Sequence, residues 1–402
     1  MQILFLHNNF PAQFGNLGQY LTLHGWDVWF GTQRKKSRMH GLKVFNYEPH
    51  RKVSEKTHPY VANFEGAVLN GQAVARAALK LKTKGLNPDI VVAHSGWGPG
   101  LFVKDIWPKA KYVGYFEWYY WPDSPDVEFF GKEGRSLDDE LSGRARNAAI
   151  LMDLANCDTG ICPTAFQADQ LPDCFKKKLH IIHDGVDIKT HCKNPLVQLE
   201  LDDVKFSEEN ELITYVARGM EPYRGFPQFM KAIEIILKKR PNTHVIIVGE
   251  DRVAYGKKLE AGDSYKKRAL KELELDESRI HFTGLLPRKQ YLEVLQASSV
   301  HVYLTIPFVL SWSMMEAMSA ECALVASDNA PVRELIEDNV HGALVNMMDP
   351  NMIADKIIDL LGDKDKRVRY GQAARARIVD HYDSDLLMIK RKELFENLLT
   401  QA

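Results

Sequence analysis

The stretch that decides the fold is Leu212–Glu250, LITYVARGMEPYRGFPQFMKAIEIILKKRPNTHVIIVGE. An apolar run over Leu212–Ala217 is typical of a buried strand, a helical pattern follows over Gly225–Lys239, and a second strand-like run covers Thr243–Val248. A strand, a helix and a strand at this spacing form a βαβ unit, in which the two strands are parallel. The stretch therefore predicts a parallel sheet covered by helices.

The same alternation extends in both directions along the chain and restarts near residue 185. Before that point we expect strands at Gln2–His7, Asp27–Phe30, Ile90–Ala93, Tyr112–Phe116, Thr159–Cys162 and Leu179–Ile182, and helices at Phe14–Leu23, Gly66–Lys82 and Gly143–Ala155. After a polar, irregular stretch we expect strands at Ile280–Phe282, Val300–Leu304 and Ala323–Ala326, and helices at Ser264–Leu273, Arg288–Gln296, Ser313–Ala320, Met352–Leu361 and over most of Lys364–Thr400. The pattern predicts an α/β protein with two doubly wound, Rossmann-like domains, 1–185 and 186–375, that face a central cleft.

Composition places the chain among ordinary globular proteins. Its 402 residues suffice for two or three domains, and 45% hydrophobic with 26% charged residues excludes disordered, collagen-like and coiled-coil chains. The 52 basic and 53 acidic side chains give a net charge of −1, without the basic excess of nucleic-acid-binding proteins. Five cysteines without C-x-x-C spacing argue against a disulfide framework and fit a reducing cytoplasm.

We expect no segment of this sequence to cross a membrane. The N-terminus MQILFLHNNF lacks the basic start and long apolar run of a signal peptide. The uncharged stretch Val294–Met315 contains Pro307 and several serines, so we interpret it as a helix end, a strand and a loop inside a domain. The expected location is cytoplasmic, with at most peripheral contact with the inner face of a membrane; the basic loop Arg34–Arg38 is the candidate for such contact, and a solvated loop is the simpler expectation.

Two common nucleotide-binding motifs are missing from the sequence. The loop after the first strand, His7–Gly18, contains no G-x-G-x-x-G, and the second predicted strand ends in Gly31-Thr32-Gln33 without a carboxylate for a ribose. No G-x-x-x-x-G-K-[ST] occurs either. Dinucleotide oxidoreductases and P-loop enzymes are therefore poor candidates.

Motifs in a fixed order resemble the retaining family 4 (group 1) glycosyltransferases, which have the GT-B fold. The motifs are RGMEPYRGF at Arg218–Phe226, IPFVLSWSMMEAM at Ile306–Met318, IIHDGVD at the domain junction, VGE at Val248–Glu250, FTG at Phe282–Gly284 and PVRELIEDNVHGALV at Pro331–Val345. The resemblance covers nearly the whole chain. It implies an acceptor site on the first domain, a nucleotide-sugar site on the second, a C-terminal helix, 376–402, that returns to the first domain, and retention of anomeric configuration.

The chain departs from this family pattern at two places. The pattern Glu, seven residues, Glu ends at Glu316, but Phe308 occupies the position of the first Glu. The usual Arg–Lys pair is Arg218 and Arg224 here, with one additional residue between the two. Both departures concern contacts to the donor rather than the fold.

Arg218 and Arg224 are the predicted catalytic cations of the second domain. Both follow a buried strand at the start of a helix, where guanidiniums can neutralise a diphosphate as leaving-group charge develops, without a metal. The alternative is an exposed ion pair with Glu221. Glu316 is expected to accept hydrogen bonds from ribose hydroxyls, with stabilisation of a helix N-terminus as the alternative.

Other donor contacts follow from the resemblance. The predicted donor-binding residues are Gly15, Gly249, Glu250, Gly284, Leu285, Phe308, Leu310, Ser311, Trp312 and Ser313, and main-chain N–H groups near Ser311–Ser313 would face a phosphate. Gly15 would permit close approach of the backbone to the donor, and ordinary turn formation is the alternative. His94, at a strand end before a glycine-rich loop, is predicted to be catalytic because the resemblance implies that it contacts the donor sugar.

The aromatic run Tyr112–Trp121, YVGYFEWYYW, is the candidate acceptor wall. Sugars present apolar C–H faces that stack on aromatic rings, so we predict acceptor contacts from Glu117, Trp118, Tyr119 and Tyr120. Packing of these rings in the core is the alternative. A nearby group of cysteines and histidines between residues 157 and 192 matches no tetrahedral zinc pattern, so we predict no metal site.

Together these features predict an enzyme of polysaccharide biosynthesis without a cofactor. It would move a sugar from a UDP-, GDP- or ADP-linked donor to a glycan, lipid-linked or small-molecule acceptor, with retention; the base, sugar and acceptor stay open. One alternative is a sugar-nucleotide 2-epimerase of the same fold, which would need further acid/base carboxylates. The other is a catalytically inactive nucleotide-sugar-binding protein, suggested by Phe308.

Overall fold

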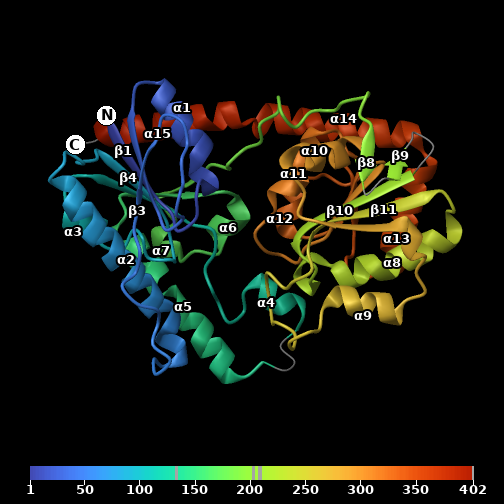
Figure 1. The fold of residues 1–402 in the computed structure, drawn as a ribbon, viewed down its shortest axis with the longest axis horizontal. Coiled ribbons are helices and arrows are strands. Elements are labelled where there is room, and N and C mark those ends of the chain that lie inside the picture. The colour runs from blue at the N-terminus through green and yellow to red at the C-terminus, as the bar shows by residue number, and fades with distance from the viewer. Residues whose placement is uncertain (132–134, 202–203, 207–210, 401–402) are drawn as a thin grey trace. The chain divides into compact units, whose positions relative to one another are not determined.

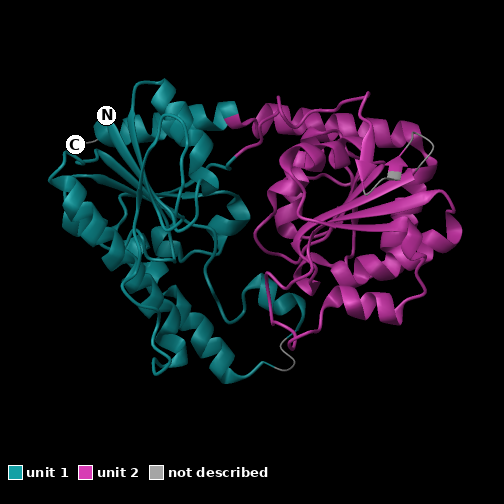
Figure 2. Ribbon diagram, in the orientation of Figure 1, with its two compact units in different colours: residues 1–184, 385–402 teal, residues 185–384 magenta. Residues whose placement is uncertain are grey.

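The computed structural model of the protein describes residues 1–131, 135–201, 204–206 and 211–400. The chain divides into two compact units (Figure 2): residues 1–184 with 385–402 form unit 1, and residues 185–384 form unit 2. The returning segment begins at Asp385, so residues 376–384, which we expected in the returning helix, belong to unit 2.

Unit 1 is built on a seven-stranded parallel sheet with the strand order β3-β2-β1-β4-β5-β6-β7 (Figure 1). Its strands are β1 (Gln2–Leu6), β2 (Asp27–Thr32), β3 (Lys43–Asn46), β4 (Ile90–His94), β5 (Lys111–Tyr115), β6 (Thr159–Cys162) and β7 (Leu179–Ile181). Its helices are η1 (Ala12–Phe14), α1 (Gly15–Leu23), α2 (Pro59–Lys82), α3 (Val103–Ile106), α4 (Pro125–Phe129), α5 (Leu137–Asn156), α6 (Ala165–Asp169), α7 (Asp173–Lys176) and α15 (Ser384–Thr400).

Both faces of the sheet of unit 1 are covered, as its apolar strands require. Along β1, Leu4 and Leu6 belong to one apolar cluster, whereas Ile3 and Phe5 belong to another, because successive side chains of a strand point to opposite faces. Helix α15 contributes Phe395 to the second cluster. The C-terminal helix therefore completes the core of unit 1.

Unit 2 contains a six-stranded parallel sheet with the order β12-β11-β10-β13-β14-β15 and a separate antiparallel pair, β8-β9. Its strands are β8 (Leu199–Leu201), β9 (Val204–Phe206), β10 (Glu211–Gly219), β11 (Thr243–Glu250), β12 (Ile280–Gly284), β13 (Val300–Tyr303), β14 (Leu324–Ser327) and β15 (Ala343–Val345). Its helices are η2 (Pro222–Arg224), α8 (Phe226–Lys239), α9 (Tyr265–Glu272), η3 (Glu277–Arg279), α10 (Arg288–Ala297), α11 (Trp312–Ser319), α12 (Ala330–Arg333), α13 (Pro350–Gly362) and α14 (Lys364–His381).

Each sheet has a point at which the strand order reverses. In unit 1 this point lies between β1 and β4, and in unit 2 between β10 and β13. Ligands of open parallel sheets bind outside the carboxyl ends of the strands at such a point. His94 ends β4 and Arg218 lies near the end of β10, so both are placed where a ligand is expected.

The predicted α/β architecture with two parallel sheets is confirmed. Several short strands were not predicted from the sequence. Strand β3 (KVFN) is an exposed edge strand, β15 has only three residues, and the polar stretch after residue 186 contains the β8-β9 pair. The stretch Lys364–Thr400, expected to be mostly helical, forms two helices, α14 and α15. Among the described residues, no helix has the length and apolar character to span a bilayer.

Candidate functional site

His94 lies at the switch point of unit 1, at the end of β4. Its side chain is buried, Nδ1 lies 3.0 Å from the carbonyl oxygen of Ser95, and Nε2 lies 3.3 Å from Oε2 of Glu117. The register of β4 on β5 pairs His94 with Tyr115, which brings Glu117, two residues farther on, beside the imidazole. Burial would lower the pKa of His94, but the charge and hydrogen bonding of Glu117 outweigh it and raise the pKa above its ordinary value.

Three further side chains surround this ion pair. Gln13 donates from Nε2 to Oε1 of Glu117 over 2.9 Å. The ring of His7 lies 4.8 Å from that of His94, and burial together with the charge of His94 lowers the pKa of His7 to about 3. Trp97, which is 43% exposed, lies 5.0 Å from His94 and 5.3 Å from His7, centroid to centroid. Unit 1 thus presents a histidine–carboxylate pair beside an exposed indole.

Asp153 is a residue of this region that the sequence analysis missed. It lies on α5, is completely buried, and accepts hydrogen bonds from Ser95 Oγ (2.8 Å) and Tyr112 Oη (2.7 Å). Burial raises the pKa of Asp153 to about 6, although these hydrogen bonds oppose the shift. Asp153 therefore holds the loop that follows His94. An acidic residue between Ile150 and Leu154, on an apolar helix face, was the available signal.

The four predicted acceptor residues separate into two groups. Trp118 and Tyr119 are each only 6% exposed, so their rings pack inside unit 1. Glu117 and Tyr120 keep part of their side chains accessible. The main chain of Tyr120 is fixed by Asn147, which accepts from the Tyr120 N–H (2.9 Å) and donates to its carbonyl oxygen (2.8 Å).

Two of the predicted donor-binding glycines make close contacts within their own units. A Cβ atom on Gly15 would lie 2.5 Å from Cβ of Pro11, and a Cβ on Gly249 would lie 2.0 Å from the carbonyl oxygen of Ala217. Gly249 also has φ +143°, which side chains rarely adopt. Packing of the chain on itself is therefore a sufficient reason for glycine at both positions.

Arg218 and Arg224, equivalent in the sequence analysis, have different environments. Arg218 is exposed at the end of β10 and makes no hydrogen bond or ion pair with any residue that the structure describes. Arg224 is 6% exposed. Its guanidinium donates from Nη1 to Thr305 Oγ1 (2.7 Å) and from Nη2 to the carbonyl oxygen of Val309 (3.0 Å). Arg218 is free to meet an anion, whereas Arg224 holds the segment after β13.

The alternative of an exposed ion pair with Glu221 is wrong. Glu221 is completely buried, and its Oε2 accepts hydrogen bonds from the backbone N–H groups of Ala254 and Tyr255. Burial raises the pKa of Glu221 above its ordinary value. This carboxylate joins the turn after β10 to the loop after β11.

Glu316 lies on α11 within a polar network of unit 2. Its Oε2 accepts from Tyr291 Oη (2.5 Å), and its Oε1 lies 3.2 Å from His191 Nε2. Burial alone would raise the pKa of Glu316, but hydrogen bonds from His191 and Tyr291 and the charge of Arg288 lower it overall. The carboxylate is therefore ionised and 16% exposed, with two lone-pair directions still available for a hydroxyl donor.

The start of α11 offers fewer main-chain donors than expected. The N–H of Ser311 donates to Tyr303 Oη (2.8 Å), and the N–H of Ser313 donates to Ser311 Oγ (3.4 Å). Phe308 and Leu310 are half-buried, and Trp312 is 46% exposed. This segment therefore offers a ligand accessible apolar side chains, while the N–H groups of Ser311 and Ser313 already have hydrogen-bond partners.

The remaining predicted donor residues lie beyond β11 and β12. Glu250 pairs with Arg252 (Oε2 to Nε, 2.7 Å), and both side chains are more than 40% exposed. Gly284 has φ +65° and no neighbour where a Cβ would stand, and Leu285 is 70% exposed. These residues are accessible at the carboxyl ends of their strands.

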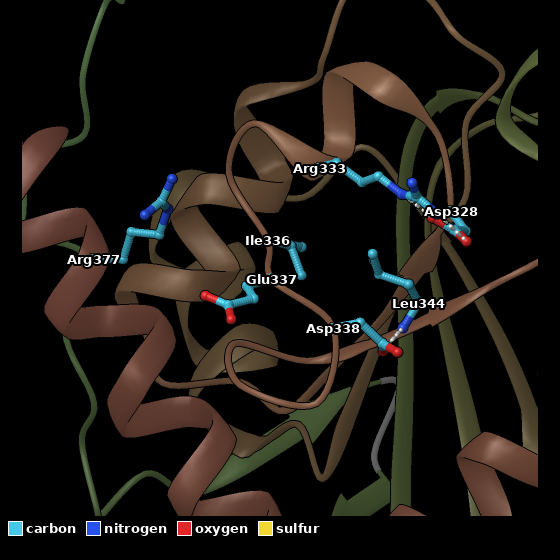
Figure 3. Close-up of a pocket in the computed structure, with 7 residues that line it drawn as sticks. All are labelled: Asp328, Arg333, Ile336, Glu337, Asp338, Leu344 and Arg377. Atoms are coloured by element: carbon cyan, nitrogen blue, oxygen red, sulfur yellow. Dashed lines mark hydrogen bonds and ion pairs between the residues drawn. The ribbon is translucent and has the colours of Figure 1, made fainter.

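The described part of unit 2 includes two cavities of ligand size. The first, about 410 Å³, is lined by Asp328, Arg333, Ile336, Glu337, Asp338, Leu344 and Arg377, and Figure 3 shows Asp328 and Arg333 joined in an ion pair beside it. The second, about 360 Å³, is lined by Met220, Asp251, Arg252, Val253, Lys258, Leu259, Asp263, Ser264 and Tyr265. The second adjoins the turn that carries Glu221, since the N–H of Met220 donates to the carbonyl oxygen of Arg252.

Two doubly wound units, each built on a parallel sheet, with these motifs after β10 and β13 define a GT-B fold of the glycosyltransferase class. The chain belongs to the family 4, group 1 glycosyltransferases. The model for the glycosyl transferase family 4 group matches residues 24–191, and that for glycosyl transferases group 1 matches residues 198–377.

Curated relatives match about half of the chain. An uncharacterized glycosyltransferase of Methanocaldococcus jannaschii is 26% identical over 226 residues, 56% of this chain and 54% of the relative. Phosphatidyl-myo-inositol mannosyltransferase of Mycolicibacterium smegmatis is 24% identical over 224 residues, 54% of this chain and 51% of the relative. The chain thus spans about half the length of the curated relatives it matches.

Solved structures share the fold over the whole chain. Sucrose-phosphate synthase of Thermosynechococcus elongatus superposes with a TM-score of 0.74 at 16% identity and covers 100% of both chains. Anabaena HepE in complex with UDP and glucose superposes with a TM-score of 0.70 at 16% identity, covering 99% of this chain and 100% of HepE.

Proposed function

We propose that this protein transfers a sugar from a nucleotide diphosphate-sugar to a hydroxyl acceptor, with retention at the anomeric carbon and without a metal. The observation that carries the proposal is Arg218, an exposed guanidinium without a described partner at the end of β10, within a chain of the glycosyltransferase family. A cation in that position can neutralise the diphosphate that departs.

The donor would be held by unit 2. Arg218 would meet the diphosphate, and Glu316, ionised by its network, would accept hydrogen bonds from the ribose. Leu285 and Glu250, accessible at neighbouring strand ends, would contact the nucleoside. Support for a UDP-linked donor comes from HepE, whose structures contain UDP, UDP with glucose, and UDP-glucose.

The acceptor would be held by unit 1. Glu117, oriented by Gln13 and His94, would accept a hydrogen bond from an acceptor hydroxyl. His94, whose two ring nitrogens face the Ser95 carbonyl and Glu117, would contact the donor sugar, as the family resemblance implies. The exposed ring of Trp97 would stack on the apolar face of a sugar. The acceptor proposed for this surface is a glycan or a lipid-linked sugar. A lipid-linked acceptor would require peripheral contact of the protein with a membrane.

The test is a thermal-shift screen against UDP-, GDP- and ADP-sugars, followed by a transfer assay with the donor that stabilises the protein. Bound donor stabilises the folded state by RT ln(1 + [L]/Kd), so saturation at one hundred times Kd gives about 2.7 kcal/mol. Stabilisation by one donor class, followed by transfer with retained configuration, supports the proposal. A donor that binds and is neither transferred nor hydrolysed would favour the inactive binding protein. Turnover of the donor without any acceptor into an epimeric sugar would favour the epimerase.

A further inference from the structure

Three aromatic side chains of unit 2 form a cluster, defined here as Tyr223, Tyr255 and Phe308. The ring of Phe308 lies 5.8 Å from that of Tyr223 and 5.4 Å from that of Tyr255, both at steep angles, and the two tyrosine rings stack at 6.5 Å. Edge-to-face and offset-stacked pairs at these separations are favourable. All three side chains are half-buried, so the aromatic cluster keeps accessible apolar surface.

The aromatic cluster stands where the sheet of unit 2 is expected to bind ligands. Tyr223 follows β10, Tyr255 follows β11 and Phe308 follows β13, and these three strands are adjacent in the order β11-β10-β13. Two of the rings therefore flank the switch point between β10 and β13, outside the carboxyl ends of the strands.

Backbone contacts tie the three loops together. Glu221 accepts the N–H of Tyr255 (2.9 Å), the N–H of Ile306 donates to the carbonyl oxygen of Tyr223 (3.1 Å), and Arg224 donates to the carbonyl oxygen of Val309 (3.0 Å). The guanidinium of Arg224 also lies 5.2 Å from the centroid of Tyr255. Hydrogen bonds to main-chain groups of three segments thus hold the rings in place, and a ligand need not assemble them.

The chemistry of the cluster suits a sugar edge without a hydroxyl. A hydroxyl pressed against Phe308 loses its water and gains no acceptor from the ring, whereas a methyl or methylene group loses nothing. Resting on the proposed function, we propose that the aromatic cluster determines donor specificity, and that the transferred sugar is a deoxyhexose whose deoxy edge packs on Phe308, Tyr223 and Tyr255. The hydroxyl group of Tyr255 can in addition bond a neighbouring sugar hydroxyl.

The expected discrimination is tenfold to a hundredfold. Apolar pockets reject a ligand with one additional hydroxyl by about two orders of magnitude at most. We therefore expect the wild-type protein to bind one deoxy donor at least about ten times more tightly than its fully hydroxylated parent.

The experiment compares dissociation constants by titration calorimetry. The probes are UDP-glucose, GDP-mannose and ADP-glucose, the 3-, 4- and 6-deoxy analogues of each, and the free nucleoside diphosphates. The variants are Phe308→Glu, which introduces a carboxylate, Phe308→Leu, which keeps an apolar wall, and Tyr255→Leu, which removes a second ring. Leu196→Glu is the matched control, because it adds the same charge at a side chain 85% exposed outside the cluster.

The preference for the deoxy analogue should persist in Phe308→Leu and Leu196→Glu. It should fall about tenfold in Phe308→Glu and weaken in Tyr255→Leu. The affinity for free nucleoside diphosphate should stay within threefold of wild type in all four variants. Tyr255→Leu decides the matter if Phe308→Glu fails to fold.

Three results would overturn the inference. Tighter binding of the hydroxylated parent by wild type, or the same preference in Phe308→Glu as in wild type, removes the cluster from sugar selection. A loss of affinity for free nucleoside diphosphate as large as the loss for donor assigns the rings to the base instead. Each of these three results leaves the proposed function standing, whereas failure of every nucleotide and donor to bind removes both proposals.

Discussion

Replacing each arginine by methionine tests whether Arg218 serves activity and Arg224 serves stability. Methionine has a similar length and no charge, so the two variants differ chiefly in what the lost guanidinium contacted. Arg224 is 6% exposed and bonds Thr305 and Val309, while Arg218 is exposed and bonds no described residue. We expect Arg224→Met to lose stability and Arg218→Met to lose activity.

The magnitude for Arg224→Met follows from its two short hydrogen bonds. Bonds to charged groups contribute about 1.5–3 kcal/mol each, and relief of a buried charge offsets part of that sum. The expected net destabilisation is about 2–4 kcal/mol. At roughly 2–4 °C per kcal/mol for a unit of about 200 residues, the melting temperature of unit 2 should fall by roughly 5–15 °C.

Arg218→Met should behave in the opposite way. Exposed substitutions away from special features change stability by less than about 0.5 kcal/mol, whereas loss of one donor to a departing charge costs about 10²–10³ in kcat. Differential scanning calorimetry and kcat/KM with the donor from the thermal-shift screen measure both effects. An Arg224→Met variant that melts with wild type, or an Arg218→Met variant with full activity, would refute the division of roles.

Three further predictions concern other parts of the chain. Glu316→Gln should raise the donor KM and cost roughly 1–2 kcal/mol of stability, because an NH₂ group replaces one acceptor of the Tyr291–His191 network; unchanged nucleotide affinity by calorimetry would place Glu316 outside the site. The pKa of His7 is about 3 in the folded protein and 6.5 in the unfolded chain, so below pH 6.5 only the unfolded chain takes up the proton. The free energy of unfolding of the wild type should therefore fall by roughly 1 kcal/mol by pH 5.5. Urea denaturation of His7→Gln should show no such fall, and identical pH profiles of the two proteins would contradict the assignment. EDTA should leave sugar transfer intact, and complete loss reversed by Mn²⁺ or Mg²⁺ would contradict metal independence.

The fold could be predicted from the sequence because its signals are local. Apolar runs of strand length and helical periods mark nearly every long element, and their alternation implies parallel sheets. Strand β3 escaped because KVFN, at an exposed edge, has no apolar run, and β15 because three residues give no period. The separate strands β8 and β9 lie in a polar stretch and were missed for the same reason.

The candidate site was less predictable because its geometry depends on contacts between distant segments. Arg218 lies near the end of β10 and Arg224 in η2 just beyond it, and only η2 directs Arg224 into the interior. Tyr255 lies in a loop without periodicity, and nothing local indicates that Glu221 binds its backbone. Glu117 was chosen from an aromatic run, yet its position beside His94 depends on the register of β4 and β5.

Phe308 is better explained together with its neighbours than as an isolated lost carboxylate. If it marked only decay of a donor site, the surrounding positions would have no reason to match an aromatic ring. Instead, Tyr223 and Tyr255 each place a ring within 6 Å of Phe308, centroid to centroid, from separate segments whose main-chain groups are held by hydrogen bonds. A glutamate at 308 would place its carboxylate against the rings of Tyr223 and Tyr255, and nearby Arg224 already donates to Thr305 and Val309. Restoring a carboxylate would thus require the two tyrosines to change as well, which is why the cluster, rather than Phe308 alone, is the unit on which donor choice should depend.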